Sequence, residues 1–398
     1  MGHARLQLKR NEDRRLRAGH LWVFSNEVDT QATPLTGFSP GEAVNVVGAN
    51  GRDLGSAYLN PHSLICARLF TRRPDTELDK SLIKHRLNIA VGLRERRYGK
   101  DAPCRLVFGE ADGLPGLLVD RLGELLVAQS TTLGMDARLG EILQALQEVC
   151  QPTGILLRND HPVREREGLE PQVAMQSGTL PGSVQVTDGP LALSLDPCDG
   201  VATGRFLDQA ANRERLLPWL PEGARVLELD CGEGAWGLRA AAASGGNALC
   251  VSAQGERLAQ VRENAQASGL RVETREGEAL EVLKALRQEE EKFDAVICNP
   301  PVLVPRKRDW NRGRRAYRQL NQAALQVTRR DGLLVTSSRS GPMSERELLR
   351  TVQAAGRHLD RALQLLETGH QGPDHPTHPA IPETAYLKTL FLRVLDSW

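Results

Sequence analysis

The chain of 398 residues has no apolar run that approaches the roughly 20 residues needed to cross a bilayer. The first 22 residues, MGHARLQLKRNEDRRLRAGHLW, are basic but lack the apolar segment of a secretory signal. The seven cysteines are dispersed, and no two have the CxxC spacing of a zinc knuckle. An odd, scattered set is typical of free thiols in a reducing compartment. These absences predict a cytoplasmic protein with no membrane span, no disulfide framework and no bound metal.

The histidines of DHPTHP, at 374–379, are the nearest approach to a metal motif. The prolines between them keep the chain extended, and no cysteine accompanies them. A structural loop or a loop at the rim of the substrate site is therefore expected at this point.

A net charge of +1 conceals two basic clusters. Residues 5–17 hold six Lys/Arg against two acids, and residues 305–330 hold nine against one. Arginine suits bidentate contacts with phosphate, so two separate clusters predict a polyanionic partner rather than two solvated faces. The candidate contacts are Arg14, Arg15, Arg17, Arg306, Lys307 and Arg308.

The length predicts two or three domains, and 40% apolar with 25% charged residues is typical of globular proteins. Residues 1–75 contain short β-type runs between turns, which predict a small β-rich domain. Residues 76–185 mix an amphipathic helix at 79–98 with strands, so an α+β domain is expected. From about 186, strands alternate with helices, which predicts an α/β Rossmann-like domain with a parallel sheet. Its last predicted helix is YRQLNQAALQVTRR, from Tyr317.

The segment LELDCGEGAWG predicts a nucleotide-binding turn. Gly232 and Gly234 follow a buried-type strand and precede a helix, as in Rossmann-type cofactor loops. Because the full G-x-G-x-x-G cradle is missing, the spacing fits methyltransferases better than nicotinamide enzymes.

The tetrapeptide CNPP ends another predicted strand. Pro300 and Pro301 fix the backbone after Asn299, which gives a rigid rim at the edge of the sheet where ligands bind. The basic run VPRKRDWNRGRRAYR follows directly and suits nucleic acid.

Together, RLQLKRNEDRRLRAGHLWVFSNEV, FGEADGLPGLLVDRLGELLVAQ, GRFLDQ, LELDCGEGAWG, NPP and GPDHPTHPAIPETAYLK resemble the bacterial 23S ribosomal RNA large-subunit methyltransferase I family. The resemblance spans nearly the whole chain. It implies an RNA-binding PUA domain, which is a β-barrel, over 1–75, a middle domain over 76–185 and an S-adenosylmethionine-dependent methyltransferase domain over 186–398. It also implies ribosomal RNA as the partner and carbon 5 of a cytosine as the methylated atom, and it leaves a homodimer open.

The resemblance further assigns site residues. The rim Asn299, Pro300 and Pro301 would face the target base. The cofactor would contact Phe206, Asp208, Gln209, Arg213, Glu228, Asp230, Gly232, Gly234, Ser252 and Glu278.

Several positions depart from the family's pattern. Methylation of cytosine carbon 5 needs a thiolate that adds to carbon 6, and Arg339 in SSRSG occupies the position of that cysteine. Ser252 stands where the family has an acid that accepts hydrogen bonds from the ribose hydroxyls of the cofactor. Losing such an acceptor weakens cofactor binding by about 1.5–3 kcal/mol. Glu256, in the next turn, could take its place. Asn299 replaces an aspartate, and Ala210 replaces an arginine.

Three functions are compatible with these departures. Cys298 could replace the lost thiol of a cytosine methyltransferase. Alternatively, Asn-Pro-Pro could serve methylation of an exocyclic amine, although Val302 stands where an aromatic residue is usual. The third is an RNA-binding protein that has lost catalysis. Because the glycine loop is retained, the sequence favours a divergent RNA methyltransferase, with the non-catalytic protein as the alternative.

Overall fold

The computed structural model describes residues 2–198 and 207–396, which form two compact units. The described parts of the first unit are residues 2–184, 196–198 and 373–384, and those of the second are residues 185–195, 207–372 and 385–396. No helix among these residues is long and apolar enough to span a membrane.

The first unit begins with a small β-rich part. Its five-stranded sheet has the order β1-β3-β4-β5-β2, and its buried core consists of Leu and Val with a few Ala and Cys residues. This arrangement confirms the β-rich prediction for the N-terminal part. The elements are β1 (Ala4–Gln7), α1 (Arg14–Arg17), β2 (Trp22–Phe24), β3 (Ala43–Val47), β4 (Asp53–Leu59) and β5 (Ile65–Thr71).

A second five-stranded sheet in this unit has the order β10-β9-β8-β7-β6. The helices α2 (Lys80–Tyr98) and α4 (Leu139–Cys150) share its hydrophobic core. The α+β prediction for this region is thus confirmed. The strands are β6 (Cys104–Phe108), β7 (Leu117–Leu122), β8 (Leu125–Ser130), β9 (Gly154–Asn159) and β10 (Gln172–Ser177).

The histidine-rich segment packs into the first unit as a structural loop. Asp374 accepts a hydrogen bond from the backbone N–H of Arg105 at 3.0 Å, and the buried Arg94 donates to the Asp374 carbonyl at 2.7 Å. Both contacts tie the loop to β6 and α2. Its acidic side chain therefore serves folding.

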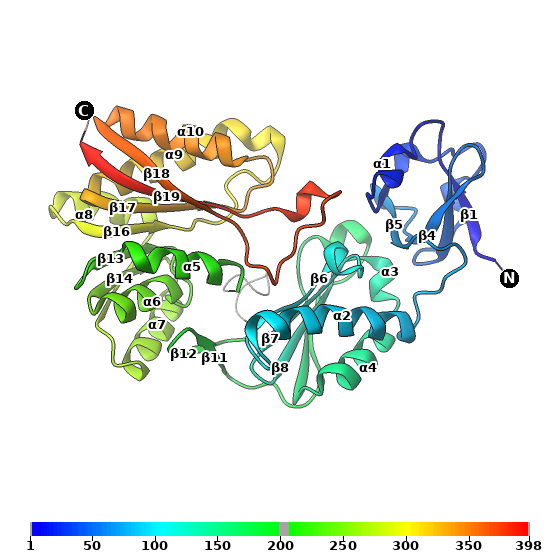
Figure 1. The fold of residues 1–398 in the computed structure, drawn as a ribbon, viewed down its shortest axis with the longest axis horizontal. Helices are drawn as coiled ribbons and strands as arrows, with labels where there is room; N and C mark the ends of the chain where they lie inside the picture. Colours follow the sequence, from blue (N-terminus) through cyan, green and yellow to red (C-terminus); the bar gives the residue numbers. More distant parts are fainter. Residues whose placement is uncertain (1, 199–206, 397–398) are drawn as a thin grey trace. The chain divides into compact units, whose positions relative to one another are not determined.

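The second unit contains a seven-stranded sheet of order β15-β14-β13-β16-β17-β19-β18 (Figure 1). The strands from β15 to β17 in this order are parallel, whereas β19 runs antiparallel to both β17 and β18. The prediction of a wholly parallel sheet was therefore wrong at this edge. The strands are β13 (Arg225–Leu229), β14 (Asn247–Ser252), β15 (Val272–Glu276), β16 (Phe293–Cys298), β17 (Thr328–Ser338), β18 (Arg361–Gly369) and β19 (Lys388–Asp396).

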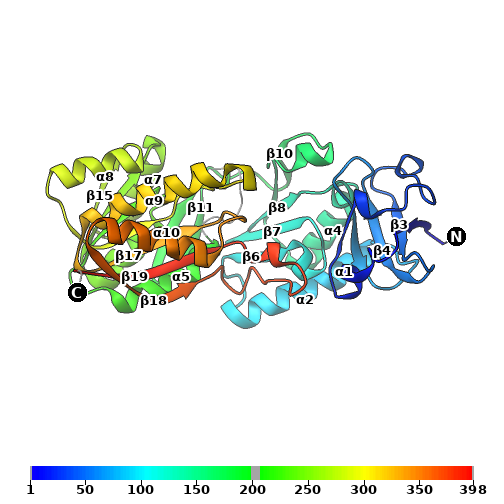
Figure 2. The same cartoon turned by 90° about the horizontal axis from the view of Figure 1, so that it is seen from above.

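Helices cover both faces of this sheet, as the Rossmann-like prediction required. One face packs against α5 (Ala210–Leu216), α6 (Ala235–Ser244) and α7 (Gly255–Ala267). The other packs against α8 (Ala279–Gln288), α9 (Trp310–Val327) and α10 (Glu345–His358). The last two lie side by side (Figure 2). A two-stranded ribbon, β11 (Val184–Asp188) and β12 (Leu191–Leu195), precedes α5.

Helix α9 begins at Trp310, two turns before the predicted start at Tyr317. Its first two turns carry exposed arginines and Gly313, with Trp310 as their one large apolar side chain, so no apolar period is visible there. At Gly313 an added Cβ would lie only 2.3 Å from the Leu303 carbonyl oxygen. The missing side chain thus lets α9 pack directly on the loop that follows β16.

Candidate active site

The turn after β13 adopts the conformation expected of a ligand-binding loop. Asp230, Gly232 and Gly234 all have positive φ angles, of 54°, 51° and 76°. The Gly234 N–H closes the turn on the Cys231 carbonyl at 2.8 Å, and α6 begins at the next residue. The free N–H groups of a helix N-terminus favour anionic or polar ligand groups.

The two predicted glycines of this turn have different surroundings. A Cβ on Gly232 would meet only the end of Arg257, at 3.8 Å, so this glycine borders open space. A Cβ on Gly234 would lie 2.9 Å from a methyl group of Val261 on α7. Gly232 therefore leaves room for a ligand, whereas Gly234 is required for helix packing.

Glu228, on β13, supports the turn from below. Its carboxylate accepts the Gly237 N–H at 2.8 Å, and the side chain is buried. Burial raises its pKa to about 8, although the hydrogen bond from Gly237 acts in the opposite direction. The structure thus gives Glu228 a part in holding α6, and its predicted contact with a cofactor stays a prediction.

The raised pKa makes stability depend on pH. Between the unfolded value near 4.5 and the folded value of about 8, the folded protein holds a proton that the unfolded chain has lost. The contribution of Glu228 to the free energy of unfolding is therefore fully present below pH 4.5 and is lost as the pH rises to 8. We expect Glu228→Gln, which keeps an acceptor for Gly237, to remove this loss. The difference in unfolding free energy between the variant and the parent, measured in urea, should grow by up to about 4 kcal/mol from pH 5 to pH 8. Parallel curves for the two proteins would contradict the assignment.

Ser252 ends β14, where an acid was expected. Its hydroxyl accepts the Gln254 N–H at 3.1 Å and is 5% exposed, so it is committed to the local turn. Glu256, in the first turn of α7, and Glu278, just before α8, are exposed. Neither carboxylate forms a hydrogen bond or ion pair with a described residue, so both are available to accept hydroxyl groups.

A buried ion pair occupies the ends of the next strands. The Arg339 guanidinium, after β17, contacts both carboxylate oxygens of Asp208, with Nε to Oδ2 at 2.9 Å and Nη2 to Oδ1 at 2.8 Å. Their side chains are 10% and 3% exposed. Burial opposes the charge of Arg339, but Asp208 outweighs it and raises the pKa of the guanidinium above its ordinary value. Arg339 is therefore held in its charged form.

The same guanidinium engages the rim residue Asn299. Arg339 Nη1 donates to Asn299 Oδ1 at 2.8 Å, and the side-chain amide of Gln209 donates to the same oxygen at 3.1 Å. An amide oxygen has two lone pairs, and both are used here. In this state Asn299 has no acceptor left for the amine of a base.

The rim itself has the predicted order but no aromatic side chain. Pro300 is buried, Pro301 is exposed, and Val302 is 46% exposed. Cys298 is fully buried in the core of the sheet, where burial raises the pKa of its thiol. A protonated, inaccessible thiol does not suit a nucleophile.

Register places the glycine turn and the Asn299 rim at one edge of the sheet. Leu229 pairs with Cys298, and Cys298 pairs with Thr336, so the residues that follow them emerge at the same level. Asp230, Asn299 and Ser337 are these residues. The cofactor turn and the ion-paired rim thus lie on three neighbouring strands.

Comparisons with known proteins agree with this architecture. A PUA-like domain model matches residues 6–72, and a methyltransferase domain model matches residues 226–323. Ribosomal RNA large subunit methyltransferase I from Shewanella denitrificans is 32% identical over 98% of this chain and 99% of its own length. The protein of the same name from Erwinia tasmaniensis is 32% identical over the same shares. The chain belongs to the ribosomal RNA large subunit methyltransferase I family.

Solved structures show that the fold of this family member is not new. A candidate SAM-dependent methyltransferase from Streptococcus mutans superposes with a TM-score of 0.81 at 17% identity, covering 98% of this chain and all of that one. A second candidate methyltransferase, solved with SAH, gives a TM-score of 0.82 at 18% identity, with the same coverage. Both span the PUA-like and the methyltransferase parts.

The other residues predicted to contact the cofactor differ in their surroundings. Arg213 is buried and donates to Asp188 of β11 at 2.8 Å, so it fastens the ribbon to α5. Phe206 lies outside the described residues. Asp208 and Gln209 join the Arg339 network, as described above. A direct contact of any of them with the cofactor stays a prediction.

The two basic clusters differ in how far their charges are already paired. On α1, Arg15 pairs with Glu27 at 2.7 Å and Arg17 with Asp13 at 3.1 Å. Arg14 contacts only the neutral Asn11. In contrast, residues 306–308 are exposed and have no acidic partner in the described part of the chain. The second cluster is thus the more available to a phosphate.

Sequence reasoning missed four members of the network. Tyr386 donates to Asp208 at 3.1 Å, and Asn212 donates to Gln209 at 2.6 Å. Ser337 and Thr389 bridge the same group across β17 and β19. Tyr386 and Ser337 carried a signal, because they lie in segments compared with the family, the C-terminal segment and SSRSG.

Proposed function

We propose that this protein binds S-adenosylmethionine at the turn after β13 and methylates RNA, with ribosomal RNA as the substrate. The observation that carries the proposal is the open, left-handed turn at Gly232, placed beside the Asn299 rim on the neighbouring strand. The names of the relatives, which specify ribosomal RNA of the large subunit, support the choice of substrate. A ribosomal RNA substrate agrees with the predicted cytoplasmic location. The homodimer stays a prediction.

The residues around the turn fit the cofactor. Gly232 and the N-terminus of α6 would take its amino-acid part, and Glu256 or Glu278 would accept its ribose hydroxyls in place of Ser252. S-adenosylmethionine supplies a methyl group on a positively charged sulfur. The protein's own task is to hold that group beside the rim and to exclude water.

The methyl acceptor is an atom that needs no thiol. Arg339 has replaced the cysteine of the family, and the thiol of Cys298 is buried and protonated. An exocyclic amine or a hydroxyl is nucleophilic without prior addition to the ring. Such a group could reach Asn299 Oδ1 only after Arg339 Nη1 has left it, and a phosphate of the RNA would be a suitable new partner for the guanidinium.

The Arg339 contacts also favour a second function. If the guanidinium stays on Asp208 and Asn299, the site cannot receive a base, and the protein binds RNA without modifying it. Both hydrogen bonds to Asn299 Oδ1 support this alternative.

One pair of measurements separates the two functions. We expect calorimetry with S-adenosylmethionine and SAH to give micromolar dissociation constants, and we expect tritium from labelled S-adenosylmethionine to enter undermodified 23S rRNA. Nucleoside mass spectrometry of that RNA should find a modified base other than 5-methylcytidine. Cofactor binding without transfer would favour the non-catalytic function. The absence of cofactor binding by the folded protein would refute the enzyme.

A further inference from the structure

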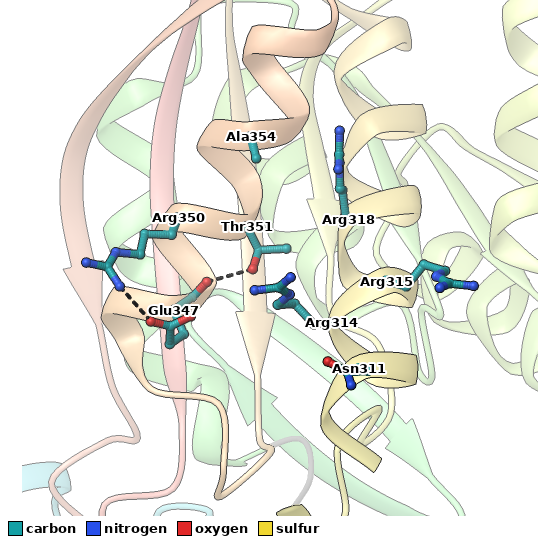
Figure 3. Close-up of a pocket in the computed structure, with 8 residues that line it drawn as sticks. All are labelled: Asn311, Arg314, Arg315, Arg318, Glu347, Arg350, Thr351 and Ala354. Carbon is teal, nitrogen blue, oxygen red and sulfur yellow. Dashed lines mark hydrogen bonds and ion pairs between the residues drawn. The ribbon is translucent and has the colours of Figure 1, made fainter. Parts of the chain in front are cut away.

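A pocket of about 490 Å³ lies between α9 and α10 and is lined mainly by arginines. Helix α9 contributes a stripe at positions 311, 314, 315 and 318, and α10 contributes one at 347, 350, 351 and 354. Each stripe has the i, i+3, i+4, i+7 spacing of a single helix face, so the two faces line one groove. In Figure 3, Arg314 extends toward Thr351, while the end of the Arg315 side chain points away from α10.

The groove carries an excess of unpaired positive charge. Glu347 is its one acidic lining residue and is bound to Arg350 at 2.9 Å. Arg314, Arg315 and Arg318 are exposed, and their side chains form no hydrogen bond or ion pair with a described residue. Like charges at i, i+4 destabilise a helix, as at Arg314 and Arg318. This face is therefore better suited to an anionic ligand than to water alone.

The position of the groove connects it to the rim. Helix α9 begins after the loop that leaves Asn299, and α10 begins after the loop that leaves Arg339. Both helices therefore start at the carboxyl edge of the sheet, where ligands of such folds bind. The exposed residues 306–308 lie in the first of these loops. From position 311 to position 318 the stripe is about 10 Å long, which is enough for more than one phosphate of a strand.

We propose that this groove binds the phosphodiester backbone of an RNA strand as it leaves the active site. The inference rests on the proposed function and names the surface that positions the substrate. An acidic protein would be expected to bury apolar side chains as well, and the lining offers only Ala354 and the methyl group of Thr351. Arginines without apolar neighbours fit a sugar–phosphate chain better.

The test compares two triple variants of the full chain. R314Q/R315Q/R318Q empties the groove of its unpaired charge, and glutamine preserves helix propensity. K284Q/R287Q/K292Q removes three exposed charges from α8 and the residues after it. The probes are a labelled 20-nucleotide oligouridine and transcribed 23S rRNA, and thermal unfolding verifies that both variants remain folded.

We expect the groove variant to bind both RNAs at least tenfold more weakly, and the α8 variant to change affinity by less than twofold. The slope of log K against log salt should fall by about 2 for the groove variant, since each lost phosphate contact contributes about 0.7. Equal affinities for the two variants would overturn the groove while leaving RNA binding intact. Tripolyphosphate or polyglutamate binding as tightly as oligouridine would also overturn it. A parent protein that binds no RNA would overturn the groove and the proposed function together.

Discussion

We expect Gly232→Leu to abolish binding of SAH, with a loss of at least about 100-fold, and Gly245→Leu to leave the affinity within about threefold. Both glycines have left-handed backbones, with φ of 51° and 66°. Leucine in that conformation costs about 1–2 kcal/mol at either position. Only Gly232 borders the proposed cofactor space, so only there would the side chain occupy the ligand's place. A 100-fold loss corresponds to about 2.7 kcal/mol.

Gly245 is a matched control because it caps the opposite end of the same helix, α6, and an added Cβ there would meet nothing within 4 Å. Calorimetry with SAH measures both variants, and urea unfolding measures the strain that they share. If the two variants lose the same stability but only Gly232→Leu loses affinity for SAH, the turn binds the cofactor. If both variants bind SAH as the parent does, the turn is only structural. Gly234 is unsuitable for this test, since its replacement would displace Val261.

The sequence was sufficient for the fold because the fold depends on patterns that lie within single segments. The alternation in 1–75 and the strand–turn–helix order around Gly232 each reflect local geometry. The antiparallel direction of β19 could not be predicted from such local patterns, because it depends on how the strand pairs with β17 and β18. The early start of α9 was hidden for a related reason: Trp310 is the one large apolar side chain that its first two turns place against the core, and the close contact at Gly313 is with the backbone of Leu303.

The candidate site was predictable in its parts but not in its connections. The resemblance places Arg339, in SSRSG, at the position of the family's cysteine, where a nucleophile would face the substrate. The structure instead directs the guanidinium into the protein, onto Asp208 and Asn299. Those partners lie 131 and 40 residues away in sequence. No local pattern carries information about such pairing, so it required coordinates.

Arg339→Met should destabilise the second unit strongly. The variant leaves the carboxylate of Asp208, which is 3% exposed, with Tyr386 as its remaining side-chain donor among the described residues. Removing one partner of a buried ion pair typically costs about 3–5 kcal/mol. For a unit of this size that loss lowers the melting temperature by about 6–20 °C. Differential scanning calorimetry on the full chain measures it.

The double variant Arg339→Met/Asp208→Asn decides what the pair is for. With both charges gone, no uncompensated carboxylate remains, and most of the lost stability should return. A coupling energy between Arg339 and Asp208 above about 2 kcal/mol would mean that their ion pair is a permanent part of the fold. The guanidinium would then also stay on Asn299, which favours the non-catalytic function. A loss below about 1 kcal/mol for Arg339→Met would mean that the guanidinium is easily released. Its contacts would then be a resting state that an RNA phosphate can open, and Asn299 would be free to accept a hydrogen bond from the target base.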